Sequence, residues 1–263
     1  MSSYASINKK WWNDITPVHA SSKLYDVKGF KKGKTSLQKI EIKELGNVEG
    51  KSMLHLLCHF GMDSLSWARH GAKVTGVDIS DSSIELAKKL SNEMNIPADF
   101  ICSDVYSLPK KLDKKYDIVF ASYGVLLWLK NLDKFAKIVS SYLKKGGIFY
   151  IVELHPFTNI LDHEFKLIYK YFDRGPFLDD SDGTYTDWNG TTIKGETYEW
   201  SYTMGDIISA ITNAGLKIEF VHEFPYTMYE QFPGLMRKNK KGEYVLRNKK
   251  IEVPLLFSLK ATK

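Results

Sequence analysis

Cysteine is scarce in this chain, which has only Cys58 and Cys102 among its 263 residues. Both fall in strand-like segments, so we expect free thiols in a reducing compartment and no disulfide framework. The first residues contain no apolar core of a signal peptide, and every stretch long enough to span a membrane carries charge. We therefore expect a cytoplasmic protein without a membrane-spanning segment.

Several motifs are also missing. The chain has no internal repeat, no low-complexity tract and no G-x-G-x-x-G motif of nicotinamide-dependent enzymes. Its one Tyr-x-x-x-Lys, from Tyr106 to Lys110, contains Pro109 and directly follows a short strand-like segment. That is a poor place for the catalytic pair of a reductase, so a reductase is disfavoured.

The composition is that of an ordinary globular protein, with 43% hydrophobic and 26% charged residues. The net charge of +6 comes largely from residues 28–34 and 237–250. No aromatic residues interleave with the lysines as a nucleic-acid surface would need, so we expect no nucleic-acid partner. We interpret 237–250 as a solvated hairpin that turns at Lys241-Gly242.

Strand-like and helix-like segments alternate from residue 51 onward. Helical patterns include one that begins near Asp81, with Ser82 and Glu85 spaced as a capping box, and one that ends at Gly146-Gly147. Short apolar runs typical of buried parallel strands occur at 53–58, 73–77, 99–102, 116–121 and 148–152, and later strands at 216–223 and 254–261. This alternation predicts an α/β fold with a parallel sheet.

Two segments interrupt or precede the alternation. Residues 1–50 are polar, contain short helical patterns and are expected to form an N-terminal cap. Residues 155–200 are rich in aromatic side chains and contain an Asn189-Gly190 hairpin signal, so we expect a lid or insert within a core of residues 51–263. The same aromatic residues could instead form a satellite core or a dimer surface.

Polar or small residues follow each of the first five expected strands. In an open doubly wound sheet, ligands bind beyond the carboxyl ends of the strands. The residues there are Cys58–Gly61, Asp78-Ile79, Asp104-Val105, Ser122-Tyr123, and Glu153 with His155. Either aspartate alone could be a helix cap. Together they suit a nucleoside, with Asp78 for the ribose hydroxyls and Asp104 for an adenine amino group.

Five ordered segments between residues 55 and 156 contain these strands and the residues that follow them. They are HLLCHFG, GAKVTGVDIS, CSDVYSLP, YDIVFASYGVLLWL and LKKGGIFYIVELHP. In that order they resemble the motifs of class I S-adenosylmethionine-dependent methyltransferases of the small-molecule type. A bacterial branch whose first motif reads HLxCHFG is most similar. That likeness also includes WWND, SSKLYDVKGF and Ser36-Leu37, and it covers most of residues 11–156.

The resemblance implies a fold, a cofactor and a reaction. The fold would be a doubly wound, Rossmann-like, mostly parallel seven-stranded sheet of order 3-2-1-4-5-7-6 whose last strand is antiparallel. The cofactor would be S-adenosyl-L-methionine, and its methyl group would pass by in-line displacement to a small-molecule acceptor. The aromatic residues of the chain, and not the resemblance, hint at an aromatic or apolar acceptor. The protein would be a monomer or a homodimer.

The resemblance also places ten residues around the cofactor. Leu57 and Gly61 fall on glycine positions of the first motif, and His55 stands where an acidic residue is usual. Trp12 and Tyr25 would close over the sulfonium, which favours an aromatic face. The full set is Trp12, Tyr25, His55, Leu57, Gly61, Asp78, Ile79, Asp104, Val105 and Ser122.

The candidate catalytic residues are Glu153, His155 and Tyr123. Residues two apart at a strand end share a face, so Glu153 and His155 could lean into a pocket beside Tyr123. His155 suits a general base near neutral pH. Alternatively, Glu153 and His155 only anchor the insert by hydrogen bonds.

Other functional classes stay open or are disfavoured. His55, Cys58 and His59 point in different directions on a strand and its turn, and no second Cys/His cluster is present, so no metal site is expected. The absence of an Asn/Asp-Pro-Pro motif after the fourth strand disfavours methylation of nucleic-acid amino groups. Because the glycine at His59 is missing, a non-catalytic cofactor-binding regulatory or scaffold protein is the main alternative.

Overall fold

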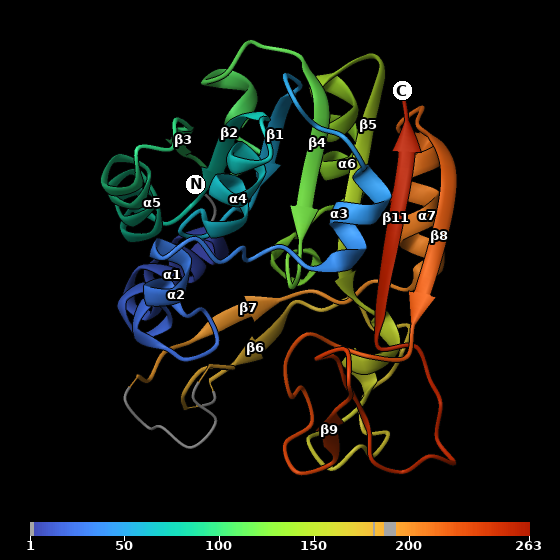
Figure 1. Cartoon of the computed structure of the whole chain (residues 1–263). Helices are drawn as coiled ribbons and strands as arrows, with labels where there is room; N and C mark the ends of the chain where they lie inside the picture. Colours follow the sequence, from blue (N-terminus) through green and yellow to red (C-terminus); the bar gives the residue numbers. More distant parts are fainter. Residues whose placement is uncertain (1–2, 181, 187–192) are drawn as a thin grey trace.

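A seven-stranded sheet of order β3-β2-β1-β4-β5-β11-β8 forms the centre of the computed structural model, which describes residues 3–180, 182–186 and 193–263 (Figure 1). β1 to β5 run parallel, and β11 is antiparallel to both of its neighbours. The strands are β1 (Ser52–Leu56), β2 (Lys73–Asp78), β3 (Asp99–Cys102), β4 (Tyr116–Ser122), β5 (Leu143–Leu154), β8 (Lys217–Phe224) and β11 (Leu256–Thr262). Within this sheet β8 is the sixth strand and β11 the seventh, so the predicted order and the antiparallel last strand are confirmed.

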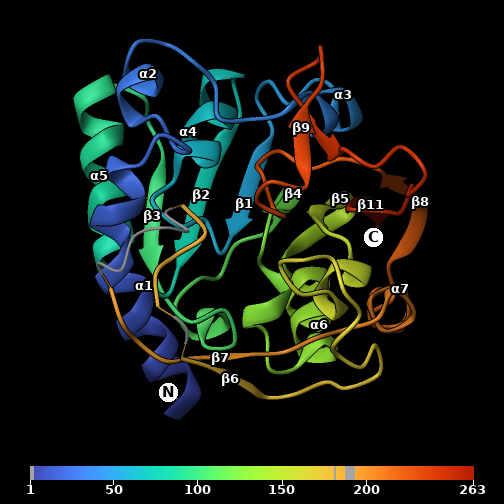
Figure 2. The same cartoon turned by 90° about the horizontal axis from the view of Figure 1, so that it is seen from below.

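Helices cover both faces of the sheet (Figure 2). α6 (Leu132–Tyr142) and α7 (Met204–Asn213) pack on one face, and α3 (Lys39–Leu45) and α4 (Met62–Arg69) pack on the other. α5 (Asp81–Met94) lies against β2 and β3. Because helices shield both faces, the central strands are apolar on both sides, which is the pattern read from the sequence. The doubly wound, Rossmann-like architecture is confirmed.

The apolar stripe of α6 shows how the layers are held together. Phe135, Ala136 and Val139 recur at helical spacing and are buried against the sheet. The rings of Phe135 and Phe149 meet edge to face, with centroids 6.4 Å apart. An edge-to-face pair of this kind adds to the free energy gained by removing both rings from water.

Two predicted boundaries are wrong. β1 ends at Leu56 and not at residue 58, because Leu57 has φ 55° and so leaves the extended conformation. α6 ends at Tyr142 and not at Gly146-Gly147, because Leu143 is already extended and pairs with Tyr116 of β4. The glycine pair therefore lies within β5.

The N-terminal helices and a small hairpin lie near the carboxyl ends of β1 to β4 (Figures 1 and 2). α1 (Ser3–Ser21) contacts α5 and β7, and α2 (Val27–Lys31) follows it. The hairpin pairs β6 (Phe177–Asp179) with β7 (Thr197–Glu199). Three short 3-10 helices connect other elements: η1 (Leu108–Lys110), η2 (Leu126–Trp128) and η3 (Pro156–Ile160).

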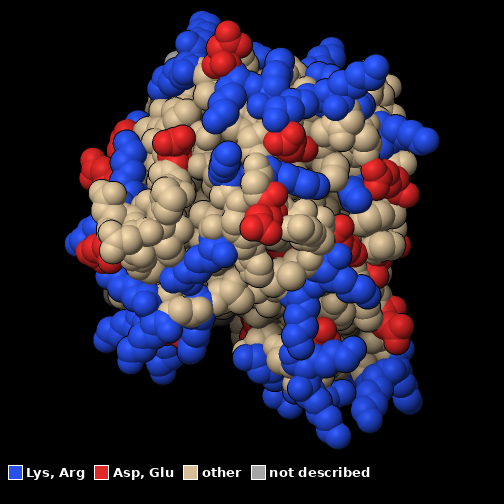
Figure 3. Space-filling model, turned by 45° about the horizontal axis from the view of Figure 1, so that its top comes forward, with Lys and Arg blue, Asp and Glu red and all other residues tan. Residues whose placement is uncertain are grey.

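The basic stretch 237–250 contains the predicted hairpin, with β9 (Met236–Lys238) paired to β10 (Tyr244–Leu246). Gly242 turns the chain with φ 89°, and its N–H donates to the carbonyl of Asn239. Lys and Arg side chains gather on both sides of a notch at the lower edge of the molecule, over α2 and over β9 (Figure 3). In the described part of the chain, no helix combines the length and apolarity needed to cross a bilayer.

Candidate active site

A cavity of about 710 Å³ opens at the carboxyl ends of β1 to β4. Its walls come from the strand ends, from α1 and from the segments around β6 and β7. All ten residues predicted to surround a cofactor line it, as does Tyr123. The rule that ligands bind beyond the carboxyl ends of parallel strands therefore located the cavity. The individual roles of these residues remain predictions.

The turn after β1 keeps the backbone path of a glycine-rich loop although two of its residues carry side chains. Leu57 has φ 55°, His59 has φ 50° and Gly61 has φ 75°. This left-handed conformation costs a residue with a Cβ roughly 1–2 kcal/mol. The His59 N–H donates to Asp78 Oδ2 at 2.8 Å and the Gly61 N–H donates to the Cys58 carbonyl at 2.9 Å, so the turn is held in place.

Gly61 is required for a second reason. A Cβ at this position would lie 2.7 Å from the Phe100 ring and 2.9 Å from the Ala87 side chain. Since real Cβ atoms essentially never come so close, any other residue would push the turn away from the sheet. Both steric and backbone constraints therefore demand glycine here.

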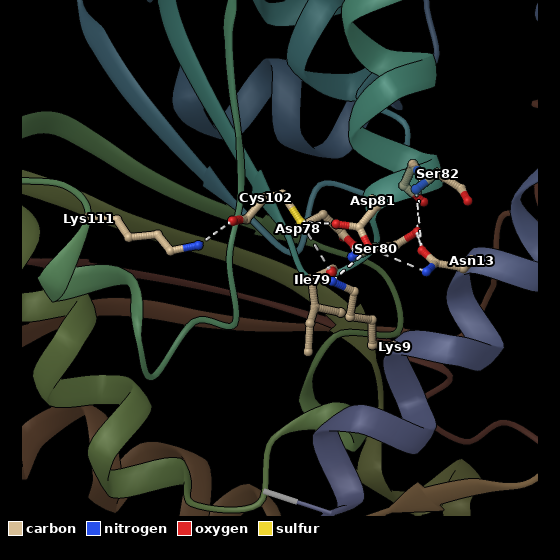
Figure 4. Close-up of polar contacts among 10 residues, drawn as sticks. Lys9, Asn13, Asp78, Ile79, Ser80, Asp81, Ser82, Cys102 and Lys111 are labelled. Atoms are coloured by element: carbon tan, nitrogen blue, oxygen red, sulfur yellow. Dashed lines mark hydrogen bonds and ion pairs between the residues drawn. The ribbon is translucent and has the colours of Figure 1, made fainter. Parts of the chain in front are cut away.

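Asp78 ends β2 and organises the neighbouring loop (Figure 4). Besides the His59 N–H, it accepts the Ser80 N–H at 2.9 Å. Burial raises the pKa of Asp78 to about 6. The carboxylate is thus fixed at the cavity wall by backbone donors and has no cationic partner among them, which leaves its remaining lone pairs for a ligand that donates hydrogen bonds.

Helix α1 is tied to the start of α5 (Figure 4). Ser80, and not the predicted Ser82, is the N-cap of α5, because its Oγ accepts the Ser83 N–H. The Ser80 hydroxyl also donates to Asn13 Oδ1 at 2.7 Å, and Lys9 pairs with Asp81 at 2.7 Å. These contacts hold one side of α1 against the edge of the cavity.

Asp104 follows β3 in the predicted place. Its Oδ1 accepts the Tyr106 N–H at 3.1 Å, and its Oδ2 lies 3.4 Å from the Ser107 hydroxyl. Val105 beside it is buried and lines the cavity. Asp78, Ile79, Asp104 and Val105 therefore line the cavity at the ends of the neighbouring strands β2 and β3.

A buried polar group joins β1, α4 and β4. His55 Nδ1 lies 2.8 Å from Ser64 Oγ, and His55 Nε2 lies 3.4 Å from Ser122 Oγ. The Ser122 hydroxyl donates to Asp63 Oδ2 at 3.0 Å. Burial lowers the pKa of His55 to about 3, so this imidazole is neutral at physiological pH. Burial raises the pKa of Asp63.

Asp63 is a cavity residue that the sequence analysis missed. It lies in the first turn of α4, where acidic residues are common because they interact favourably with the helix dipole. Its position in the sequence therefore did not indicate a functional role. Its carboxylate accepts the Ser122 hydroxyl at the end of β4, close to His55 of β1. The chain therefore has an acid at this wall in spite of His55.

His59 takes part in a hydrogen-bond network at the cavity, which His59 and Thr184 line. His19 Nδ1 lies 3.1 Å from His59 Nε2, and His19 Nε2 lies 3.2 Å from Thr184 Oγ1. Beside them the hydroxyls of Tyr25 and Tyr185 are 2.5 Å apart. Burial lowers the pKa of His19 to about 3 and that of His59 well below its usual value. Two neutral histidines thus connect α1, the turn after β1 and the segment around residue 184.

A metal site needs several ligand side chains that converge on one point. Among the residues that the structure describes, no cluster of three or more His, Cys, Asp or Glu side chains could hold a metal ion. Both cysteines carry free thiols.

The structure separates the three candidate catalytic residues. Glu153 accepts the N–H groups of Gly124 at 2.5 Å, Val125 at 2.6 Å and Leu126 at 3.1 Å, so it supports the turn after β4. The Phe157 N–H donates to His155 Nδ1, and His155 Nε2 is 2.8 Å from Glu223 Oε1. Of the three, only Tyr123 is among the described residues that line the cavity.

Part of the aromatic insert borders the cavity and part does not. Tyr185 and Trp200 line it, together with Glu199, whose pKa burial raises to about 7. Tyr169 and Phe172 are instead exposed, at 61% and 78% of their surface. The Asn189-Gly190 hairpin signal lies outside the described residues.

Comparison with known proteins finds similarity in the part of the chain that forms the first five strands. Residues 54–151 match a family model described as a methyltransferase domain. The ubiquinone biosynthesis O-methyltransferase of Coxiella burnetii is 27% identical over 150 residues, which are 56% of this chain. The aligned part of the chain spans 58% of that relative's length.

Solved structures extend the likeness to most of the chain. An S-adenosylmethionine-dependent methyltransferase from Mesorhizobium loti has a TM-score of 0.58 and 20% identity, covering 84% of this chain and 94% of that one. Magnesium protoporphyrin IX methyltransferase from Synechocystis has a TM-score of 0.57 and 15% identity, covering 98% and 99%. At such identities the likeness concerns the fold.

Proposed function

We propose that the chain methylates a small molecule, because it has the fold of the class I S-adenosylmethionine-dependent methyltransferases and its residues 54–151 match a family model described as a methyltransferase domain. The observation that carries the proposal is the pair of carboxylates, Asp78 and Asp104, at the ends of β2 and β3 on one cavity wall. S-adenosyl-L-methionine, when bound, would supply a methyl group activated by a sulfonium. The chain's part is to bind, align and, where needed, deprotonate.

The residues present fit this cofactor. Asp78 would accept hydrogen bonds from the ribose hydroxyls and Asp104 one from the adenine amino group. Ile79 and Val105 offer apolar contact for the base. His55, Leu57, Gly61 and Ser122 would lie along the methionine part, and Trp12 and Tyr25 would shield the sulfonium. All of these residues line the cavity.

We propose that Asp63 pairs with the ammonium group of the cofactor. A carboxylate bonded only to hydroxyls at a cavity wall attracts a cation, and a charged hydrogen bond contributes about 1.5–3 kcal/mol. Asp63→Asn should therefore weaken S-adenosyl-L-methionine binding roughly tenfold to a hundredfold in calorimetry. Methylthioadenosine, which lacks the amino acid, should bind both proteins equally. Equal losses for the two ligands would show that the substitution only disturbs the fold.

The cofactor itself is tested by calorimetry with S-adenosyl-L-methionine and NADH. The expected result is binding of the first at one site per chain and no binding of NADH. Binding of NADH alone would favour the reductase. If the methyl donor binds but no acceptor from a panel of alcohols, phenols, amines and thiols is methylated, the regulatory or scaffold alternative gains.

The residues that line the cavity support a proposal for the acceptor, and the segments around it support one for a cap and a lid. Trp11, Trp128 and Trp200 line it, which supports an acceptor with aromatic or apolar character. We propose that residues 1–50 act as a cap and residues 155–200 as a lid over a core of residues 51–263. A cytoplasmic monomer or homodimer fits a biosynthetic enzyme of this kind.

A further inference from the structure

Glu41 is a buried carboxylate directly behind the cavity wall. It belongs to α3 and has no exposed surface, at 0%. Its Oε1 accepts the Gln38 N–H at 2.6 Å, and its Oε2 lies 3.0 Å from the Tyr123 hydroxyl oxygen, so one hydrogen bond joins these two oxygens. Tyr123 lines the cavity, whereas Glu41 is not among the described residues that line it. The phenol therefore connects a buried acid to the proposed reaction site.

The surroundings of Glu41 disfavour its negative charge. The titratable groups that face it are Asp63 of α4, Tyr123 after β4, Tyr150 of β5 and Tyr226 after β8. None of these is a base that could pair with it. Burial, reinforced by the nearby charge of Asp63, raises the pKa of Glu41 to about 8. The free protein thus carries a proton on Glu41 at neutral pH.

Glu44, one turn further along α3, provides a contrast. It accepts the Tyr150 hydroxyl at 2.8 Å, and it also pairs with His222 at 2.8 Å. Tyr150 is not among the described residues that line the cavity. The same carboxylate–phenol pair therefore occurs twice on this helix, and within the described residues the Glu41 pair reaches the cavity whereas the Glu44 pair does not.

The bond to Glu41 is not needed to hold the backbone at Tyr123. The Tyr123 N–H donates to the Val152 carbonyl at 2.8 Å, and Glu153 binds the next N–H groups along the chain. Tyr123 has φ 45° and is followed by Gly124 with φ 75°. Because contacts with β5 hold the turn, the hydrogen bond between the Tyr123 phenol and the Glu41 carboxyl group is not needed for the backbone. It acts on the Tyr123 side chain alone.

We propose that Tyr123 and Glu41 form the proton-accepting pair for the methyl transfer, an inference that rests on the proposed function. The acceptor atom forms a bond to the methyl carbon, the bond from that carbon to sulfur breaks, and its electron pair goes to sulfur, which loses its positive charge. The acceptor's proton passes to Tyr123 Oη while the Tyr123 proton passes to Glu41 Oε2. Tyr123 is then the catalytic residue, and Glu41 acts through it as a positioning residue.

Glu41 must be ionised to receive that proton. The positive charge of the bound cofactor supplies the means, because a nearby cation favours the ionised form of a carboxyl group. Cofactor binding should thus expel a proton from Glu41 and prepare the pair. This is measurable without knowing the acceptor.

The test is calorimetry of S-adenosyl-L-methionine binding at about pH 7.5 in buffers of different ionisation enthalpy, which reports protons released. The wild type should release roughly half a proton more than Glu41→Gln. The control Glu44→Gln should behave as the wild type. The ligand's own titration is common to all three proteins, so their difference isolates Glu41.

The possible results distinguish failure of the proposed function from failure of the proton-accepting pair. If the wild type does not bind the cofactor, the proposed function fails. If wild type and Glu41→Gln bind it with equal proton release, the proton-accepting pair is refuted and the proposed function stands. Should Glu41→Gln not fold, infrared difference spectra of the wild type decide: loss of a protonated-carboxyl band on cofactor binding is expected, and an unchanged band overturns the inference. Asp78 contributes little, since its pKa of about 6 leaves it mostly ionised at that pH. Glu199 lines the cavity and its pKa is raised to about 7, so the infrared comparison is made in Glu199→Gln, in which the remaining change reports Glu41.

Discussion

Glu153→Gln is expected to lower the free energy of unfolding by about 3 kcal/mol, because the carboxylate satisfies several backbone N–H groups in the interior. Its side chain is 3% exposed. The amide of glutamine would turn a donor toward N–H groups that also donate, so at least one buried donor loses its partner. Urea denaturation monitored by circular dichroism measures the change.

Glu223→Gln is the matched control for this experiment. Glu223 is an acid at the end of β8 whose side chain is 55% exposed and contacts His155. Its replacement should change the free energy of unfolding by less than about 1 kcal/mol. If both variants lose the same stability, Glu153 does not hold the turn after β4 as the hydrogen bonds indicate.

Asp78→Ala should weaken binding of S-adenosyl-L-methionine by about a hundredfold, which corresponds to about 2.7 kcal/mol. The substitution removes the carboxylate proposed to hold the ribose hydroxyls, and it also frees the His59 and Ser80 N–H groups that shape the wall. Calorimetric titration gives the dissociation constant. Thermal unfolding of the same variant shows whether the loss comes from binding or from the fold.

Asp81→Ala is the control for Asp78. Asp81 is three residues later, its side chain is 51% exposed, and its ion pair with Lys9 is at the surface. We expect its affinity for the cofactor to stay within about threefold of the wild type. An unchanged affinity in Asp78→Ala would mean that the ribose has been placed wrongly.

The strand ends show why much of the site could be predicted from sequence. Asp78 and Asp104 each follow a short apolar run, and the geometry of a parallel sheet brings such positions to one edge. The order of the sheet followed from the resemblance and is confirmed. Periodicity also identified the buried face of α6, because a helix that packs on a sheet needs an apolar stripe.

Residues that reach the site by tertiary contact could not be found in this way. Glu41 is 82 positions away from Tyr123, and no local pattern relates them. Asp63 has the appearance of an ordinary acid at a helix start. His155 lies near the expected strand end, yet the chain turns into η3 there and directs the ring to Glu223. Spacing along a strand fixes a face only while the strand continues.

The histidine pair of the cap has a consequence for kinetics. His19 and His59, with Thr184, join three separate segments beside the cavity through uncharged hydrogen bonds. We expect the parting of these segments to limit the rate at which a ligand in the cavity exchanges. Residence time and equilibrium affinity are thereby separate quantities in this protein, and a substitution at His59 can shorten the first while leaving the second nearly unchanged.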